Sequence, residues 1–101
     1  MYVIAWEYLV KPGQEAAFHQ AYGPEGGWIL LFRQSPGFLG TELLHDEQNA
    51  QRFMTVDRWT SRAAFDSFHA DWQAEYQAHD ELCSSLTEQE TFLGAFALLS
   101  V

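Results

Sequence analysis

Basic residues are scarce in this chain of 101 residues. Five Lys and Arg stand against 14 Asp and Glu, which gives a formal net charge of −9 with histidine neutral. A surface with this charge repels the phosphates of nucleic acids and the head groups of anionic lipids. The composition therefore excludes nucleic acid and membrane surfaces as expected partners.

Cysteine and long apolar segments are equally rare. The single cysteine, Cys83, has no partner for an internal disulfide, so we expect a reducing compartment, the cytoplasm. No uncharged apolar segment approaches the roughly 20 residues of a membrane span. The apolar start, MYVIAWEYLV, lacks a basic leader and a cleavage site and alternates around Glu7 as a strand does. We therefore expect a soluble protein without an export signal.

The common metal and cofactor motifs are missing. The four histidines and the acidic residues form no HxxxH or HExxH grouping, and the sequence contains no GxGxxG, GxSxG or CxxC motif. We therefore predict neither a metal site nor a cofactor.

Apolar residues, by contrast, are abundant: 48% of the chain is hydrophobic and 16% is aromatic. A domain of this size hides only about two-thirds of the surface that its unfolded chain exposes. The excess predicts either a pocket or an interface with a partner.

The pattern of the chain predicts one α+β domain over residues 1–101 with the order β-α-β-β-α-β. Strands are expected over 2–10, 38–45, 52–59 and 91–101, with a bulge at Gly94. The first helix begins near residue 14 and is interrupted at 23–27, where Pro24 and three glycines oppose its continuation. The second begins at Thr60 or Ser61 and runs to His79, before a short helical turn over 80–86. This is the ferredoxin-like arrangement, a four-stranded antiparallel sheet with helices on one face.

The two terminal strands are apolar on both faces, although the helices of such a fold cover only one face. The last strand places Phe92, Phe96 and Leu98 on one side and Leu93, Ala95, Ala97 and Leu99 on the other. A second copy of the chain covers the bare face at least cost, with residues 96–101 along the partner's edge strand. We therefore predict a homodimeric barrel that pairs through the sheet faces and the C-terminal strand. The alternative is a monomer in which the tail is a well-buried edge strand.

Three segments carry a resemblance to a known family: the turn Lys11-Pro12-Gly13, the sequence SPGFLG over 35–40, and DRWTS over 57–61 followed by Ala64 and Phe65. In this order they resemble the antibiotic-biosynthesis monooxygenase (ABM) superfamily of dimeric α+β barrels. The resemblance implies a homodimer with a cavity between each sheet and its helices. It also implies activities such as cofactor-independent oxygenation of aromatic polyketides or oxidative haem degradation.

The haem-degrading branch of that family has an Asn on the first strand, a Trp on the second helix and a His near the end of that helix. Here Trp6 and Phe68 stand at the first two places, and only His79 comes near the third, displaced by one residue. These departures argue against haem degradation.

Two residues are candidates for a catalytic base. His79 closes the apolar stripe of the second helix, where it acts on a substrate or, alternatively, interacts with the last helix carbonyls. Glu7, the only charge in the first strand, has a raised pKa if it is buried alone, but it is structural if Arg33, Arg52 or Arg58 pairs with it. Asp57 presents the same choice, and near a strand end we expect it to be solvated or bridged.

Aromatic residues are candidates for a cavity wall, or alternatively for the core. They are Trp6, Tyr8, Trp28, Phe32, Phe68, Trp72 and Tyr76. Our first hypothesis is a cofactor-independent, monooxygenase-like enzyme that acts on a small aromatic or polyketide-like molecule. The second is a non-catalytic barrel that binds a small ligand or is associated with stress, since a fold does not confer a reaction.

Overall fold

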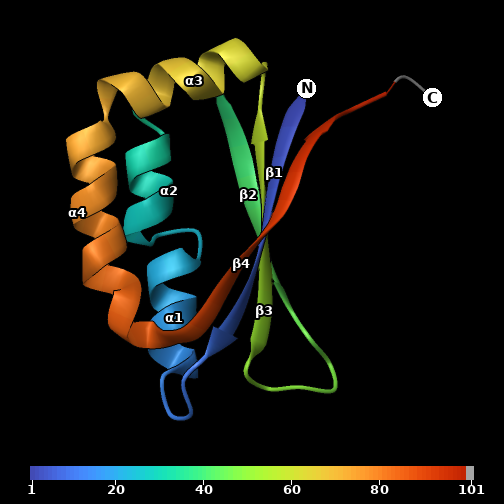
Figure 1. Cartoon of the computed structure of the whole chain (residues 1–101), viewed down its shortest axis with the longest axis vertical. Coiled ribbons are helices and arrows are strands. Elements are labelled where there is room, and N and C mark those ends of the chain that lie inside the picture. Colours follow the sequence, from blue (N-terminus) through green and yellow to red (C-terminus); the bar gives the residue numbers. More distant parts are fainter. Residues whose placement is uncertain (100–101) are drawn as a thin grey trace.

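A computed structural model describes residues 1–99 of the chain (Figure 1). The strands are β1 (Tyr2–Val10), β2 (Phe38–His45), β3 (Arg52–Trp59) and β4 (Thr87–Ala97). The helices are α1 (Glu15–Tyr22), α2 (Gly27–Phe32), α3 (Arg62–Asp71) and α4 (Gln73–Cys83), and a 3-10 turn, η1 (Ser84–Leu86), leads into β4. The predicted α+β fold with a ferredoxin-like order of elements is confirmed, and each of the two predicted helical regions is divided in two.

The four strands form one antiparallel sheet in the order β2-β3-β1-β4. All four α-helices lie on the same side of this sheet, and α2 and α4 run alongside each other (Figure 1). None of the helices in residues 1–99 is long and apolar enough to cross a membrane.

Alternation along β3 decides which side chains face the helices. Phe53, Thr55, Asp57 and Trp59 are buried, and they are paired in register with Tyr8, Trp6, Ile4 and Tyr2 of β1. Successive side chains of a strand point to opposite faces, so the residues between them lie on the outer face. The inner face of the two central strands is therefore mainly aromatic, with the hydroxyl of Thr55 and the carboxyl of Asp57 embedded in it.

The interruption of the first helix is confirmed at Gly23-Pro24-Glu25-Gly26, between α1 and α2. A Cβ on Gly26 would collide with the backbone carbonyl of Ala21, and one on Gly27 would collide with the imidazole of His79. The glycines thus allow α2 to begin close against the end of α1 and against α4. This close approach carries Trp28 and Phe32 into the core.

The second helical region begins as predicted, with the Ser61 side chain accepting a hydrogen bond from Ala64 N–H at 3.1 Å. It does not continue unbroken, because Trp72 adopts φ −119° and ψ 24° and separates α3 from α4. Hydrogen bonds still run from Trp72 N–H to Phe68 O and from Tyr76 N–H to Trp72 O. The helical path therefore bends at Trp72, and α4 continues to Cys83, beyond the predicted end at His79.

The last strand differs from its prediction in extent and in facing. It begins at Thr87 and ends at Ala97, and the predicted residues 100–101 lie outside the part of the chain that the structure describes. The predicted bulge is confirmed: Trp6 pairs with Phe92 and Ala5 with Gly94, which leaves Leu93 as the extra residue. Phe92 and Phe96 were expected on one face, but the bulge places Phe92 with Trp6 on the inner face and Phe96 with Val3 on the outer face.

The outer face of the sheet carries apolar side chains beside two ion pairs, Glu7–Arg52 and Glu42–Arg58. Its residues include Val3, Ala5 and Leu9 of β1, Met54 and Val56 of β3, Leu44 of β2 and Phe96 of β4. Leu44 and Phe96 are exposed, as are Leu98 and Leu99 beyond the end of β4. In residues 1–99 no helix covers this face.

Candidate functional site

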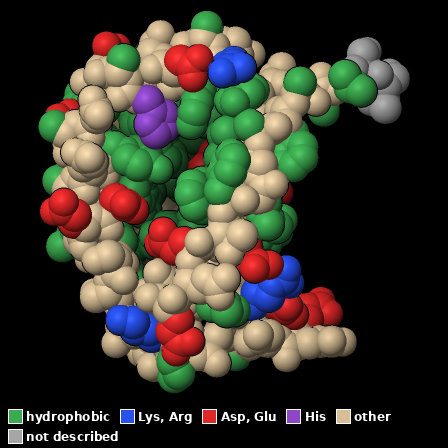
Figure 2. All heavy atoms as spheres, in the orientation of Figure 1, with side chains coloured by type: hydrophobic (Ala, Val, Ile, Leu, Met, Phe, Trp, Pro, Cys, Tyr) green, Lys and Arg blue, Asp and Glu red, His purple; other side chains and the backbone are tan. Residues whose placement is uncertain are grey.

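A cavity of about 210 Å³ lies between the sheet and the helices. Figure 2 shows a hollow there, surrounded by hydrophobic side chains, with acidic side chains close to its edge. The wall consists of Trp6, Tyr8, Tyr22, Trp28, Ile29, Phe32, Thr41, Thr55, Asp57, Tyr76, Asp80 and Glu90. It is therefore mainly aromatic with a few polar groups, as small-molecule sites usually are.

Asp57 is the buried carboxyl group of this cavity, with 8% of its surface exposed. Thr41 Oγ1, on the neighbouring strand β2, donates a hydrogen bond to Asp57 Oδ1 at 2.6 Å. Burial raises the pKa of Asp57 to about 6, although the bond from Thr41 opposes the shift. Asp57 therefore titrates closer to neutral pH than an exposed aspartate does.

Three tyrosine hydroxyls surround the same space. Tyr8 lies 3.3 Å from the Thr55 hydroxyl oxygen. Burial raises the pKa of Tyr8 and of Tyr22, and it raises the pKa of Tyr76 to about 12. All three hydroxyls keep their protons at neutral pH and are available as hydrogen-bond donors.

Edge-on contacts between aromatic rings fix the aromatic part of the wall. The ring centroids of Tyr8 and Tyr22 are 5.0 Å apart, those of Trp28 and Tyr76 4.9 Å, and those of Trp6 and Phe92 5.2 Å. These separations are typical of favourable aromatic pairs. The contacts join β1, α1, α2, α4 and β4, so the wall is held from several elements at once.

Two more carboxylates, Asp80 on α4 and Glu90 on β4, belong to the wall and are exposed, which places them at its open edge. Desolvation raises the pKa of Glu90, and the charge of Asp80 adds to the effect. No group of three or more His, Cys, Asp or Glu in residues 1–99 is arranged to hold a metal ion.

The model of the antibiotic biosynthesis monooxygenase family matches residues 1–82 of this sequence. The chain belongs to this family. The resemblance carried by the turn and helix-start segments is thereby confirmed. A search of the curated proteins gives no match.

Solved structures with the same fold include members assigned to this ABM family. A point mutant of SnoaB, a cofactor-independent oxygenase from Streptomyces nogalater, has a TM-score of 0.81 and 19% identity over 99% of this chain and 94% of that chain. A protein from Deinococcus radiodurans assigned to the family has a TM-score of 0.78 and 14% identity over 100% and 95% of the two chains. One from Nitrosomonas europaea has a TM-score of 0.72 and 17% identity over 99% and 100%. At these identities the likeness concerns the fold.

Five of the seven aromatic candidates come together in the wall of this ABM-family cavity: Trp6, Tyr8, Trp28, Phe32 and Tyr76. Phe68 lies elsewhere: it is 1% exposed and packs between Trp59 and Phe32, with centroid distances of 5.2 and 5.3 Å. Trp72 packs against the same core from the bend between α3 and α4. The structure therefore gives Phe68 and Trp72 a place in the core and the other five a place at the cavity.

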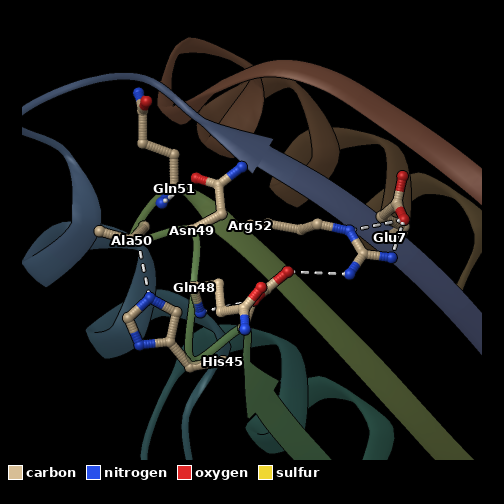
Figure 3. A network of polar contacts seen from close by, with 8 residues as sticks. Glu7, His45, Gln48, Asn49, Ala50, Gln51 and Arg52 are labelled. Carbon is tan, nitrogen blue, oxygen red and sulfur yellow. Dashed lines mark hydrogen bonds and ion pairs between the residues drawn. The ribbon is translucent and has the colours of Figure 1, made fainter.

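Glu7 lies on the outer face of the sheet, on the opposite side from the cavity. Arg52 donates to Glu7 Oε2 through Nε at 2.9 Å and through Nη2 at 2.5 Å, and its Nη1 lies 3.0 Å from Asp46 Oδ2 (Figure 3). This is the structural pairing that the sequence left open as an alternative. Arg52 thus joins β1 to the loop between β2 and β3.

His79 packs against α2 and lies outside the cavity wall. Its ring lies edge-on to Trp28 at a centroid distance of 4.6 Å, and its Nε2 is 3.7 Å from Cys83 Sγ. Burial lowers the pKa of His79. The imidazole therefore supports Trp28 from behind the wall.

The expectation that Asp57 is solvated or bridged is wrong, because its side chain points to the covered face of β3. Its even spacing from Phe53, Thr55 and Trp59 was the available signal, since these residues share one face of a strand. Thr41 carried no such signal, because its role depends on the register between β2 and β3.

Proposed function

We propose that this ABM-family protein is a cofactor-independent monooxygenase that acts on a small aromatic molecule, with Asp57 as the catalytic base. The observation that carries the proposal is a buried carboxyl group with a pKa of about 6 inside an aromatic cavity. This proposal replaces His79 and Glu7 as the proposed bases, because both lie outside the cavity wall.

The reaction begins at a methylene carbon that a neighbouring ring ketone makes acidic. Asp57 removes one proton, and the carbanion transfers an electron to dioxygen. The two radicals then join in a C–O bond, and Asp57 returns the proton to the peroxide. Loss of water converts the CH–OOH group into C=O. Each turnover thus consumes one dioxygen and releases one water, with no additional reductant.

The wall assists this chemistry in two ways. Tyr8 and Tyr76 donate hydrogen bonds to the ketone oxygen as negative charge develops on it, which stabilises the carbanion. The surrounding rings exclude water, which strengthens these hydrogen bonds. Trp6 packs against the flat face of the substrate.

The cavity volume limits the substrate. Pockets for drug-sized ligands usually measure about 300–1,000 Å³, whereas this one measures about 210 Å³. The volume supports a molecule of one or two rings, with a third ring reaching the open edge. Haem is larger than this space accommodates.

Oxygen consumption tests the proposal. Purified protein is incubated with one- to three-ring ketones that carry an activated methylene, with anthrone as the largest. We expect dioxygen uptake equal to the product formed and one labelled oxygen atom per product from ¹⁸O₂. Asp57→Asn should lower kcat by about 100-fold or more, the usual contribution of a general base.

His79→Gln and Glu7→Gln are the matched controls, and both should retain activity within about threefold, because neither side chain reaches the wall. Full activity of the Asp57 variant refutes the proposed base. Substrate binding without oxygen uptake in the wild type supports the second hypothesis, a binding protein.

We further propose that the protein is a homodimer whose outer sheet faces pack together. The exposed apolar side chains of Leu44 on β2 and Phe96 on β4 support this arrangement, because a partner's sheet would remove them from water. Leu98 and Leu99 extend the apolar surface beyond the end of β4 toward a partner's edge strand.

A further inference from the structure

The charged groups of the cavity all have the same sign. Within the described chain, its wall includes the carboxyl groups of Asp57, Asp80 and Glu90 but no Lys, Arg or His. The ion pairs found in residues 1–99 use other acids. Asp57 Oδ1 accepts a hydrogen bond from Thr41, and no residue of this part of the chain bonds to its Oδ2. The Asp57 carboxyl group thus brings an oxygen that has no hydrogen-bond partner in residues 1–99 to the wall of the cavity.

The three carboxyl groups reach the cavity from three elements, β3, α4 and β4, rather than forming an acidic run along one surface. Asp57 lies at the buried end, and the exposed Asp80 and Glu90 lie at the open edge. All three act on one hydroxyl group: their charges add to burial in raising the pKa of Tyr76 to about 12. Their fields therefore converge inside the cavity.

The aromatic ring faces of the wall favour the same kind of ligand. The faces of aromatic rings are electron-rich and attract organic cations, most strongly those of Trp and Tyr. A carboxylate ligand would instead meet repulsion from all three acids in a poorly hydrated space. A bare metal ion does not fit either, because the described residues contain no metal-holding group of acids.

From these observations we infer that the cavity selects an aromatic molecule that carries a positively charged amine. Its ring lies against Trp6 and Tyr76. Its amine lies at the open edge between Asp80 and Glu90, which leaves Asp57 to exchange a proton at the ring end. The inference rests on the proposed oxygenase function, because it names the substrate class of the same cavity.

Binding of three matched probes without dioxygen tests this inference. Tyramine, 4-ethylphenol and 3-(4-hydroxyphenyl)propanoate share one phenol ring and carry a positive, a neutral and a negative side chain. Isothermal titration at pH 7.5 should give a Kd for tyramine about tenfold or more below that for 4-ethylphenol, equivalent to about 1.4 kcal/mol. The propanoate should bind most weakly. Equal affinities, or a preference for the propanoate, would overturn the inference.

Variants separate the cavity from the overall negative charge. The double variant Asp80→Asn, Glu90→Gln should bring the affinity for tyramine to within about threefold of that for 4-ethylphenol. The control double variant Glu81→Gln, Glu88→Gln removes the same charge from exposed neighbours outside the wall and should keep the tenfold preference. If both double variants lose the preference equally, general attraction explains it and the inference fails.

The outcome is independent of the oxygenation test. A preference for tyramine in a protein that consumes no dioxygen leaves the amine selectivity standing and refutes the proposed reaction. Oxygenation of neutral ketones without any preference for tyramine supports the proposed reaction and refutes the amine selectivity.

Discussion

Asp57 combines two properties that oppose each other. A carboxyl group in an aromatic wall is costly when ionised, because the ion loses its hydration. The same cost raises its pKa to about 6, which suits the role of base that we propose for it. The residue is thus expected to favour activity at the expense of stability.

We therefore predict that Asp57→Asn stabilises the protein at neutral pH. The pKa of Asp57 is raised from 3.8 to about 6. At a pH between these two values, the folded state therefore holds a proton that the unfolded state has released. Stability from this group is present below pH 4 and is lost as pH rises toward 6 and above. The variant lacks this loss and should gain about 1–3 kcal/mol at pH 7.

Urea denaturation of the wild type and the variant at pH 4, 5, 6 and 7 measures the difference. The gap in unfolding free energy should widen with pH and level off above about pH 7. A gap that is constant over this range would contradict the raised pKa.

The helical elements owe their positions to small backbone features. Gly26 has an ordinary φ of −76°, so an alanine there is acceptable to the backbone itself. The alanine is costly because its Cβ would collide with the carbonyl of Ala21 at the end of α1. The approach of α2 to α1, and with it the place of Trp28 in the cavity wall, depends on this missing atom.

Gly26→Ala should accordingly destabilise the protein by about 2 kcal/mol or more, since the collision is with backbone that cannot rotate away. Gly13→Ala is the control: Gly13 has a φ of 85° but open space around it, so its cost should be only about 1 kcal/mol. Chemical denaturation of both variants provides the comparison. An equal loss of unfolding free energy in the two variants would show that the backbone around Gly26 shifts readily to admit the added methyl group.

For the helices and strands, the sequence predicted the type and order of the elements, but it missed one bend and the start of one strand. Strand alternation and the break at the Pro24 region were visible because each has a local residue signature. The bend at Trp72 was not, because apolar spacing continues across it and a single changed dihedral pair leaves no pattern. The start of β4 was also missed, because Glu88, Gln89 and Glu90 offer no apolar alternation.

The candidate site was only partly predictable for a related reason. Trp6, Tyr8 and Tyr76 were recognisable as large residues on buried faces. The bond from Thr41 to Asp57 joins two strands, so it depends on a register that no local pattern specifies. Likewise, Arg33, Arg52 and Arg58 were equal candidates to pair with Glu7 until the sheet placed Arg52 beside it.

For the molecule as a whole, we predict that a charge on the outer face separates the dimer. Phe96→Asp should lower the solution mass at micromolar concentration from that of two chains to that of one, because a buried unpaired charge is unfavourable in an apolar interface. Analytical ultracentrifugation measures this mass.

Leu30→Asp is the matched control, since Leu30 is as exposed as Phe96 but lies on α2, on the helical side. It should leave the dimer intact. A wild-type protein that sediments as a monomer would refute the proposed assembly and leave the cavity chemistry to be judged separately.

The bulge in β4 has a consequence for how sequences of this family are compared. Leu93 is the extra residue, and the residues before and after it already have partners on β1. A chain that lacks Leu93 would keep Phe92 beside Trp6 and Phe96 beside Val3. A one-residue gap at this point in an alignment is therefore structurally silent. The same gap two residues earlier or later would turn one aromatic ring from the cavity side to the outer side, or the reverse.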